Sequence, residues 1–284
     1  MLRIVMDSAG DLPRDWIDEY QIDIIPINVH LGDHPKLEGV DLSPSDFYQW
    51  VEETGMIPKS SQPTPQQYLE FYRKIADLGD TILSIHLTSK LSGTYESAVR
   101  AAAELNQEGY HVIPFDSLSG TAIQGFMCCE ARVMDRRGED LGAILRRIEE
   151  IREKTEVIFT LDSLDFARKS GRVQMLETIL ASILKIKPII VLKKGTLTVA
   201  HKVRTRKASL DYILQEMSRR VENTLVNAAV MHAHDLQTAL NFGESVQNIL
   251  NCGKFFIEEL SIGIAANLGP GSIGIIAYPA GEGI

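Results

Sequence analysis

The chain has 284 residues, of which 44% are hydrophobic and 24% charged, which suits one large globular domain or two of ordinary size. Its formal net charge of −9 argues against a general binder of nucleic acids or of anionic membranes. The odd number of cysteines argues against a disulfide framework, and no apolar run is long enough to span a membrane. The N-terminus lacks a signal-peptide pattern, so we expect a cytoplasmic protein.

Short apolar runs alternate with capped or amphipathic segments in the first half of the chain, and this alternation predicts a parallel sheet with helices on its faces. Three prolines within residues 58–65 forbid a helix there and predict an ordered loop, and residues 30–41 are expected to form a loop or loose hairpin. The predicted strands are 2–6, 22–29, 82–87 and 111–115, and the predicted helices are 14–20, 43–53, 65–78, the segment after Gly93, 121–136 and 140–154.

A domain boundary is expected near Thr155, which divides the chain into residues 1–154 and 155–284. The predicted fold is α/β with two α/β domains, the first with a parallel sheet flanked by helices and the second with a mixed sheet and helices. In the second half the predicted strands are 156–161, 187–192, 197–200, 225–231, 254–260 and 272–278, and the predicted helices are 175–184, 207–221 and 236–250.

Small polar residues follow three of the predicted strands in the first half, as Asp7-Ser8, Ser92-Gly93 and Asp116-Ser117. In one parallel sheet these pairs are expected to crowd along the same edge, where ligands bind in open α/β sheets. Ser92 is a candidate N-cap, and Gly93 allows a ligand to approach the backbone of an anion-friendly helix start. The alternative is that Ser92 only caps its helix and that Asp7 and Ser8 only hold their loop together.

Three other patterns resemble chemical sites, but each lacks a required part. A nucleophilic Ser92 would need a neighbouring base, and His86 lies inside an apolar run with no acid evidently placed to orient it. His232 and His234 lie on one face of a strand end but lack a third metal ligand. The glycine pattern at 269–274 matches a dinucleotide fingerprint formally, but a strand follows it where a helix is needed.

Basic residues stand out around a predicted hairpin in this acidic chain. They are either a solvated rim or a docking surface for a partner or a phosphate group. The same two interpretations apply to a second basic set around Gly171. The first set is Lys193, Lys194, His201, Lys202, Arg204, Arg206 and Lys207, and the second is Arg168, Lys169 and Arg172.

An ordered set of short motifs along essentially the whole chain resembles the DegV family. Each motif is short, but their order is specific. They are Asp7-Ser8 with Asp11-Leu12-Pro13, Lys59-Ser60-Ser61-Gln62-Pro63, Leu91-Ser92-Gly93-Thr94-Tyr95 with Ser97-Ala98, Asp116-Ser117, Ser170-Gly171-Arg172, Lys187-Pro188, Gly195 with Lys202 and Arg204, and Gly269-Pro270-Gly271.

The resemblance implies two α/β domains with a palmitate-like long-chain fatty acid bound between them and no other cofactor. It also implies that the chain is not itself a catalyst, and that it presents the fatty acid to a separate fatty acid kinase. Transient contact with a membrane is a further expectation. The implied carboxylate site consists of Ser60 and Ser92, with Ser61 and Gly93 close by and Asn267 where many members have histidine. The implied partner-binding residues are Arg172, Lys202 and Arg204.

The physical chemistry of a fatty acid agrees with this expectation. About fifteen buried CH₂ groups at about 0.8 kcal/mol each give about 12 kcal/mol of gross driving force, part of which is offset by lost ligand freedom. The tail therefore supplies most of the affinity, and the hydroxyl groups determine the orientation in which the fatty acid binds. Two alternatives stay open, namely an enzyme that transfers an acyl or phosphoryl group through Ser92, and a regulatory module in which the lipid is a structural plug.

Overall fold

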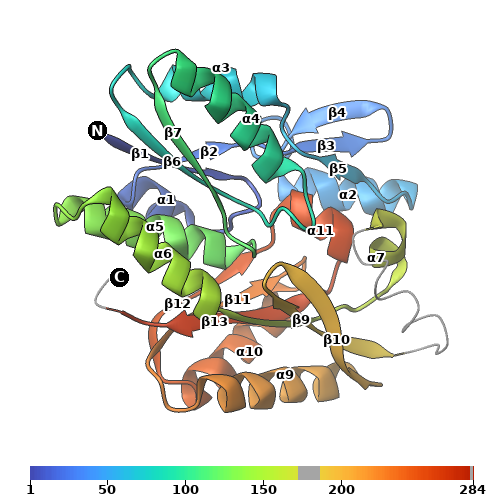
Figure 1. The fold of residues 1–284 in the computed structure, drawn as a ribbon. Helices are drawn as coiled ribbons and strands as arrows, with labels where there is room; N and C mark the ends of the chain where they lie inside the picture. Colours follow the sequence, from blue (N-terminus) through green and yellow to red (C-terminus); the bar gives the residue numbers. More distant parts are fainter. Residues whose placement is uncertain (172–185, 282–283) are drawn as a thin grey trace.

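The first sheet of the molecule is parallel, as predicted. The fold is that of a computed structural model that describes residues 1–171, 186–281 and 284 (Figure 1). Four strands in the order β2-β1-β6-β7 form this sheet, all pointing the same way. They are β1 (Leu2–Asp7), β2 (Ile22–Ile25), β6 (Thr81–His86) and β7 (His111–Asp116).

Helices cover both faces of the parallel sheet (Figure 1). On one face lie α3 (Pro65–Ile75) and α4 (Thr94–Gln107), which bury apolar side chains such as Tyr72 and Leu105. The start of α3 follows from its sequence, because Thr64 and Gln67 form a capping box in front of it. On the other face lie α1 (Arg14–Glu19), α5 (Ala122–Arg136) and α6 (Leu141–Lys154).

A small antiparallel sheet corrects two of the predictions. Residues 22–29 do not form one strand, since Pro26 cannot donate a ladder hydrogen bond and β2 ends at Ile25. The chain enters a separate sheet of order β4-β3-β5, and the proline-rich stretch predicted as a loop contributes one of its two edge strands, β5. These strands are β3 (Asn28–Leu31), β4 (His34–Leu37) and β5 (Lys59–Ser61), and α2 (Pro44–Thr54) lies between β4 and β5 in the chain.

The second large sheet is mixed, as predicted. Its order is β10-β9-β8-β13-β11-β12, and all neighbours are antiparallel except β11 and β12. Helices α9 (Arg206–Val221) and α10 (Leu236–Ile249) cover its outer face. Helices α7 (Asp165–Ser170) and α11 (Ile262–Leu268) contact each other, and α11 also contacts β3 and β5 of the small sheet. The strands are β8 (Glu156–Thr160), β9 (Lys187–Lys193), β10 (Thr196–Val203), β11 (Val226–His232), β12 (Cys252–Glu259) and β13 (Ile273–Pro279).

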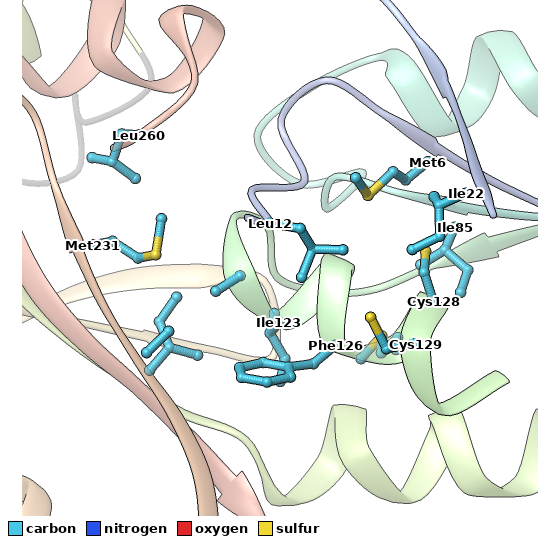
Figure 2. Close-up of a cluster of buried hydrophobic side chains, with 14 of the residues drawn as sticks. Met6, Leu12, Ile22, Ile85, Ile123, Phe126, Cys128, Cys129, Met231 and Leu260 are labelled. Atoms are coloured by element: carbon cyan, nitrogen blue, oxygen red, sulfur yellow. The ribbon is translucent and has the colours of Figure 1, made fainter. Parts of the chain in front are cut away.

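One apolar core joins the two halves of the chain. Leu12 and Phe126 of the first half face Met231 and Leu260 of the second within the same buried cluster (Figure 2). The ring of Phe126 packs edge-on against that of Tyr278, with ring centroids 5.2 Å apart. The division at residues 154 and 155 stays a prediction, with the parallel sheet before it and the mixed sheet after it.

Some sequence expectations concern single residues or segments. Cys128 and Cys129 are buried free thiols of α5. In the described residues, no helix combines the length and the apolar character needed to cross a membrane. The predicted helix at 175–184 and the candidate partner residue Arg172 lie outside the described residues.

Candidate ligand-binding pocket

A cavity between the two large sheets is lined by residues from both halves of the chain. Its volume is about 1070 Å³, including the open space at its mouth. Among the described residues that line it, none carries a formal charge. Apolar side chains form most of the wall, among them Val157, Phe159, Leu192, Leu197, Met231 and Ile276, and the polar lining consists of Ser60, Ser61, Gln62, Thr88, Ser92, Thr121, Asn267 and Ser272.

The turn after β6 forms one wall of the cavity, and two aspartates hold it in place. Oδ2 of Asp7 accepts a hydrogen bond from the Leu87 N–H at 3.0 Å, and Oδ1 of Asp116 accepts one from the Ser89 N–H at 3.2 Å. These aspartates end β1 and β7, the strands on either side of β6. The predicted crowding of the strand-end residues along one edge is therefore confirmed.

Ser92 lines the cavity, but it does not cap α4 as predicted. The N-cap of α4 is Gly93, which makes no side-chain capping bond. The Ser92 hydroxyl oxygen lies 2.7 Å from Oγ1 of Thr94 and accepts a long hydrogen bond of 3.3 Å from the Thr94 N–H. The helix follows Gly93 as predicted, but its N-cap lies one residue after the candidate Ser92, so the hydroxyl of Ser92 sits in the turn that borders the cavity.

Ser60 and Asn267 come together from the two halves of the chain. Oγ of Ser60 donates a hydrogen bond to the Gly263 carbonyl at 3.3 Å and accepts one from Nδ2 of Asn267 at 3.2 Å. The same Asn267 amide nitrogen also donates to the Gly263 carbonyl at 2.6 Å. Both N–H groups of the Asn267 side chain are therefore engaged within the protein.

Ser61 lies next to Ser60 on β5 and has a different partner. Its hydroxyl oxygen is 2.9 Å from Nε2 of His30 on β3. Gln62 and Thr88 also line the cavity, although neither was predicted as a site residue. Gln62 was visible within the quoted Ser60–Pro63 motif, but nothing in the sequence distinguishes its side chain from that of its neighbours.

Helix α11 was not predicted, and it supplies part of the cavity wall through Gly263, Ile264, Asn267 and Leu268. The carboxylate of Glu38 accepts hydrogen bonds from the N–H groups of Ile262 and Gly263 in the first turn of α11, and from the Ser8 hydroxyl. Burial raises the pKa of Glu38 to about 7. Asp11, whose pKa is raised by burial and then by the nearby charge of Glu38, accepts a hydrogen bond from the Ser261 N–H at 3.0 Å.

The three histidines considered as a base or as metal ligands each contact a group within the protein. Nδ1 of the fully buried His86 lies 3.1 Å from Oδ2 of Asp7, so an acid does orient this ring, and its Nε2 lies 2.8 Å from Oγ of Ser84. Nδ1 of His232 accepts a hydrogen bond from the Asp235 N–H, and the ring of His234 stacks on Tyr48. Within the described part of the chain, no group of three or more potential side-chain ligands could hold a metal ion.

Ion pairs engage much of the basic set around the β9–β10 hairpin. Lys193 pairs with Glu156 at 2.6 Å, Lys194 with Glu153 at 2.9 Å and Arg206 with Asp235 at 2.7 Å. Lys202 is half-buried and interacts within the protein. Arg204 is exposed and forms no ion pair with a described residue. A partner-binding role for Lys202 and Arg204 stays a prediction.

The chain is similar to known proteins along its full length. A family model described as "Uncharacterised protein, DegV family" matches residues 1–280. A DegV domain-containing protein of Halalkalibacterium halodurans is 30% identical over 279 residues, covering 98% of both chains. The DegV protein of Bacillus subtilis is 29% identical over 279 residues, covering 96% of this chain and 98% of the relative.

Solved structures show the same arrangement. A DegV family protein of Thermus thermophilus, described by its fatty acid binding, superposes with a TM-score of 0.90 at 28% identity and covers 98% of this chain and 99% of its own. DegV of Bacillus subtilis, described as a fatty acid binding protein, superposes with a TM-score of 0.89 at 26% identity, with the same coverage.

Proposed function

The chain belongs to the DegV family, and on this premise we propose that it binds a long-chain fatty acid in the cavity between its two large sheets. The observation that carries the proposal is that one cavity combines an apolar wall with hydroxyl and amide groups, those of Ser60, Ser92 and Asn267. Structural relatives described as fatty acid binding proteins support the same ligand class.

The tail of the ligand accounts for most of the expected affinity. Side chains such as Phe159, Leu192 and Ile276 offer an apolar surface from which water is displaced. Each buried CH₂ group contributes about 0.8 kcal/mol, so chain length matters more than any single polar contact. Loss of ligand freedom and of rotamer freedom in the wall offsets part of this gain.

The head group is held by neutral donors in this proposal. The Ser60 proton, which now faces the Gly263 carbonyl, turns toward the carboxylate, and the Ser92 hydroxyl donates from the opposite turn. Asn267 acts through Ser60, because its own N–H groups are bound to Ser60 and Gly263. An amide at residue 267 cannot carry a positive charge, so the head group is held by hydrogen bonds alone.

We further propose that the protein presents the bound acid to a separate fatty acid kinase in the cytoplasm and does not transform it alone. The Ser92 hydroxyl is bonded to Thr94 and has no histidine partner among the described residues, which gives a nucleophilic mechanism little support. The exposed Arg204 and its neighbour Lys202, with Arg172, are the proposed kinase contacts. Brief contact with a membrane would allow the lipid to be exchanged.

Extraction of the purified protein with organic solvent tests the binding proposal. Mass spectrometry is expected to find a long-chain fatty acid, and the lipid-free protein is expected to bind added palmitate or oleate. Leu192→Trp, which fills part of the apolar cavity, should weaken that binding while the circular dichroism spectrum stays unchanged. An empty protein that ignores both acids would refute the proposal.

A second assay separates the carrier from the alternatives. Acyl phosphate should form only when ATP and a fatty acid kinase are added, and it should not form with ATP and this chain alone. Turnover by the chain alone would favour a serine-dependent enzyme. A stable partner complex that is indifferent to lipid removal would favour a regulatory module.

A further inference from the structure

The side chain of Gln62 occupies the space beside Gly93. A Cβ atom added to Gly93 would lie 2.8 Å from Nε2 and 3.1 Å from Cδ of Gln62. The backbone of Gly93 has φ −80° and ψ 9°, which any residue can adopt, so its conformation does not require glycine. A Cβ at this position would therefore displace the Gln62 amide, which is the end of a flexible side chain.

The backbone from which this amide projects is firmly held. The Gln62 carbonyl accepts a hydrogen bond of 3.1 Å from Nδ2 of Asn28, and the amides of Asn28 and Gln67 bond each other in both directions. Pro63 follows and is buried, which restricts the backbone further. The Gln62 side chain therefore starts from a fixed point at the mouth of the cavity.

The amide itself has no hydrogen-bond partner among the residues that the structure describes, although both of its ends can bond. It is exposed and lines the cavity together with Ser61 and Ser92. It belongs to the segment that carries Ser60 and Ser61, and it lies against Gly93 of the segment that carries Ser92. No described lining residue offers a positive charge, so an available N–H donor at this place is significant.

We infer that Gln62 is a ligand-binding residue that recognises the head group, with Nε2 donating a hydrogen bond to a carboxylate oxygen. This inference rests on the proposed function. Because Oε1 of the same amide is an acceptor, the site also accommodates a neutral hydroxyl head group on the same tail. Recognition then depends on hydrogen-bond geometry. A negative charge placed at residue 62 repels a carboxylate head group but can still accept a hydrogen bond from a hydroxyl head group.

The test uses the full chain, stripped of lipid, with palmitate and hexadecanol as probes at about pH 8, where a carboxyl group is ionised. Gln62→Glu should weaken palmitate binding by about tenfold or more, since the donor is lost and a like charge faces the ligand. Hexadecanol should bind the variant within about twofold of wild type. Gln237→Glu, which adds the same charge on the exposed surface of α10, should leave both probes unchanged.

A second pair of variants tests the contact with Gly93. Gly93→Ala should displace the amide and weaken palmitate binding by about fivefold to tenfold. Gln62→Ala should weaken it similarly, and adding Gly93→Ala to Gln62→Ala should have no further effect, because the space is then vacant. Strictly multiplicative losses in the double variant would contradict the inference.

The outcomes distinguish the role of Gln62 from the proposed binding of a fatty acid. Palmitate binding by Gln62→Glu equal to that of Gln237→Glu would overturn the role of Gln62. Equal losses for palmitate and hexadecanol would also overturn it, since the side chain would then shape the cavity and not recognise the head group. Wild-type protein that binds neither probe would instead overturn the proposed function, and this inference would fall with it.

Discussion

Nδ2 of Asn267 donates a hydrogen bond to Oγ of Ser60 at 3.2 Å, across 207 positions of the sequence. The pair joins β5 of the small antiparallel sheet to α11 of the second half. The orientation of the Asn267 amide is fixed by its other bond, because a turned amide would place an oxygen 2.6 Å from the Gly263 carbonyl. The position of the Ser60 hydroxyl is thereby coupled to the position of α11.

Asn267→Ala is predicted to weaken palmitate binding by about 1–2 kcal/mol, because Ser60 loses the donor that orients its hydroxyl. Titration calorimetry on lipid-free protein measures the change. Asn241→Ala, on the exposed surface of α10, is the matched control and should bind as wild type does. Unchanged affinity in Asn267→Ala would remove Asn267 from the head-group site.

Ser92→Ala is predicted to lower palmitate affinity by about 1–3 kcal/mol through loss of a donor to the carboxylate. The free energy of unfolding should change by less than about 1 kcal/mol, since Ser92 is not the N-cap and its bond to the Thr94 N–H is long at 3.3 Å. Calorimetry and urea unfolding measure the two quantities, with Ser245→Ala on α10 as control. Lower stability with full affinity would make the hydroxyl purely structural.

Local signals were sufficient to predict most of the large elements. Pro65 after Thr64, with Gln67 three residues beyond the cap, predicts the start of α3, and the structure has that capping box. Apolar runs followed by Asp-Ser pairs predict strands whose ends meet at one edge, and Asp7 and Asp116 do hold the turn between them. These features depend on residues close together in the chain.

The features that the sequence did not reveal depend on distant partners. Helix α11 is short, and its first turn is capped by Glu38 from the first half of the chain. The strand at 59–61 exists because β3 pairs with it across the small sheet. The contact of Gln62 with Gly93 likewise joins two separate motifs. No local pattern encodes such pairings, so the composition of the pocket mouth required the structure.

Glu38 is predicted to make stability fall as pH rises. Burial raises the pKa of Glu38 from its ordinary value of 4.5 to about 7, so the folded state binds this proton more tightly than the unfolded chain. Its contribution is complete below about pH 4.5 and is lost as pH rises through 7. The difference corresponds to about 3 kcal/mol. Urea unfolding across this pH window measures the slope in wild type and in Glu38→Gln.

Glu38→Gln should flatten that slope, because glutamine does not titrate. The variant should stay folded, since a glutamine oxygen can still accept the Gly263 N–H while its amide donates to Ser8. A smaller slope of the same sign should remain, since the pKa of Asp11 is also raised by burial. Glu244→Gln on the exposed surface of α10 should keep the wild-type slope. Identical slopes in wild type and Glu38→Gln would show that Glu38 does not titrate in this window.

Gly195→Ala tests the contact of the β9–β10 hairpin with the pocket turn. Gly195 has φ +76°, and an added Cβ would clash with Oγ1 of Thr88, which lines the cavity. Gly32 is a matched control in the β3–β4 hairpin, with φ +63° and open space around it. Gly32→Ala should cost only the backbone strain, about 1–2 kcal/mol in urea unfolding. Gly195→Ala should cost at least about 1 kcal/mol more and also weaken palmitate binding, because Thr88 must move. Equal losses of stability with unchanged binding would mean that the hairpin does not support the turn.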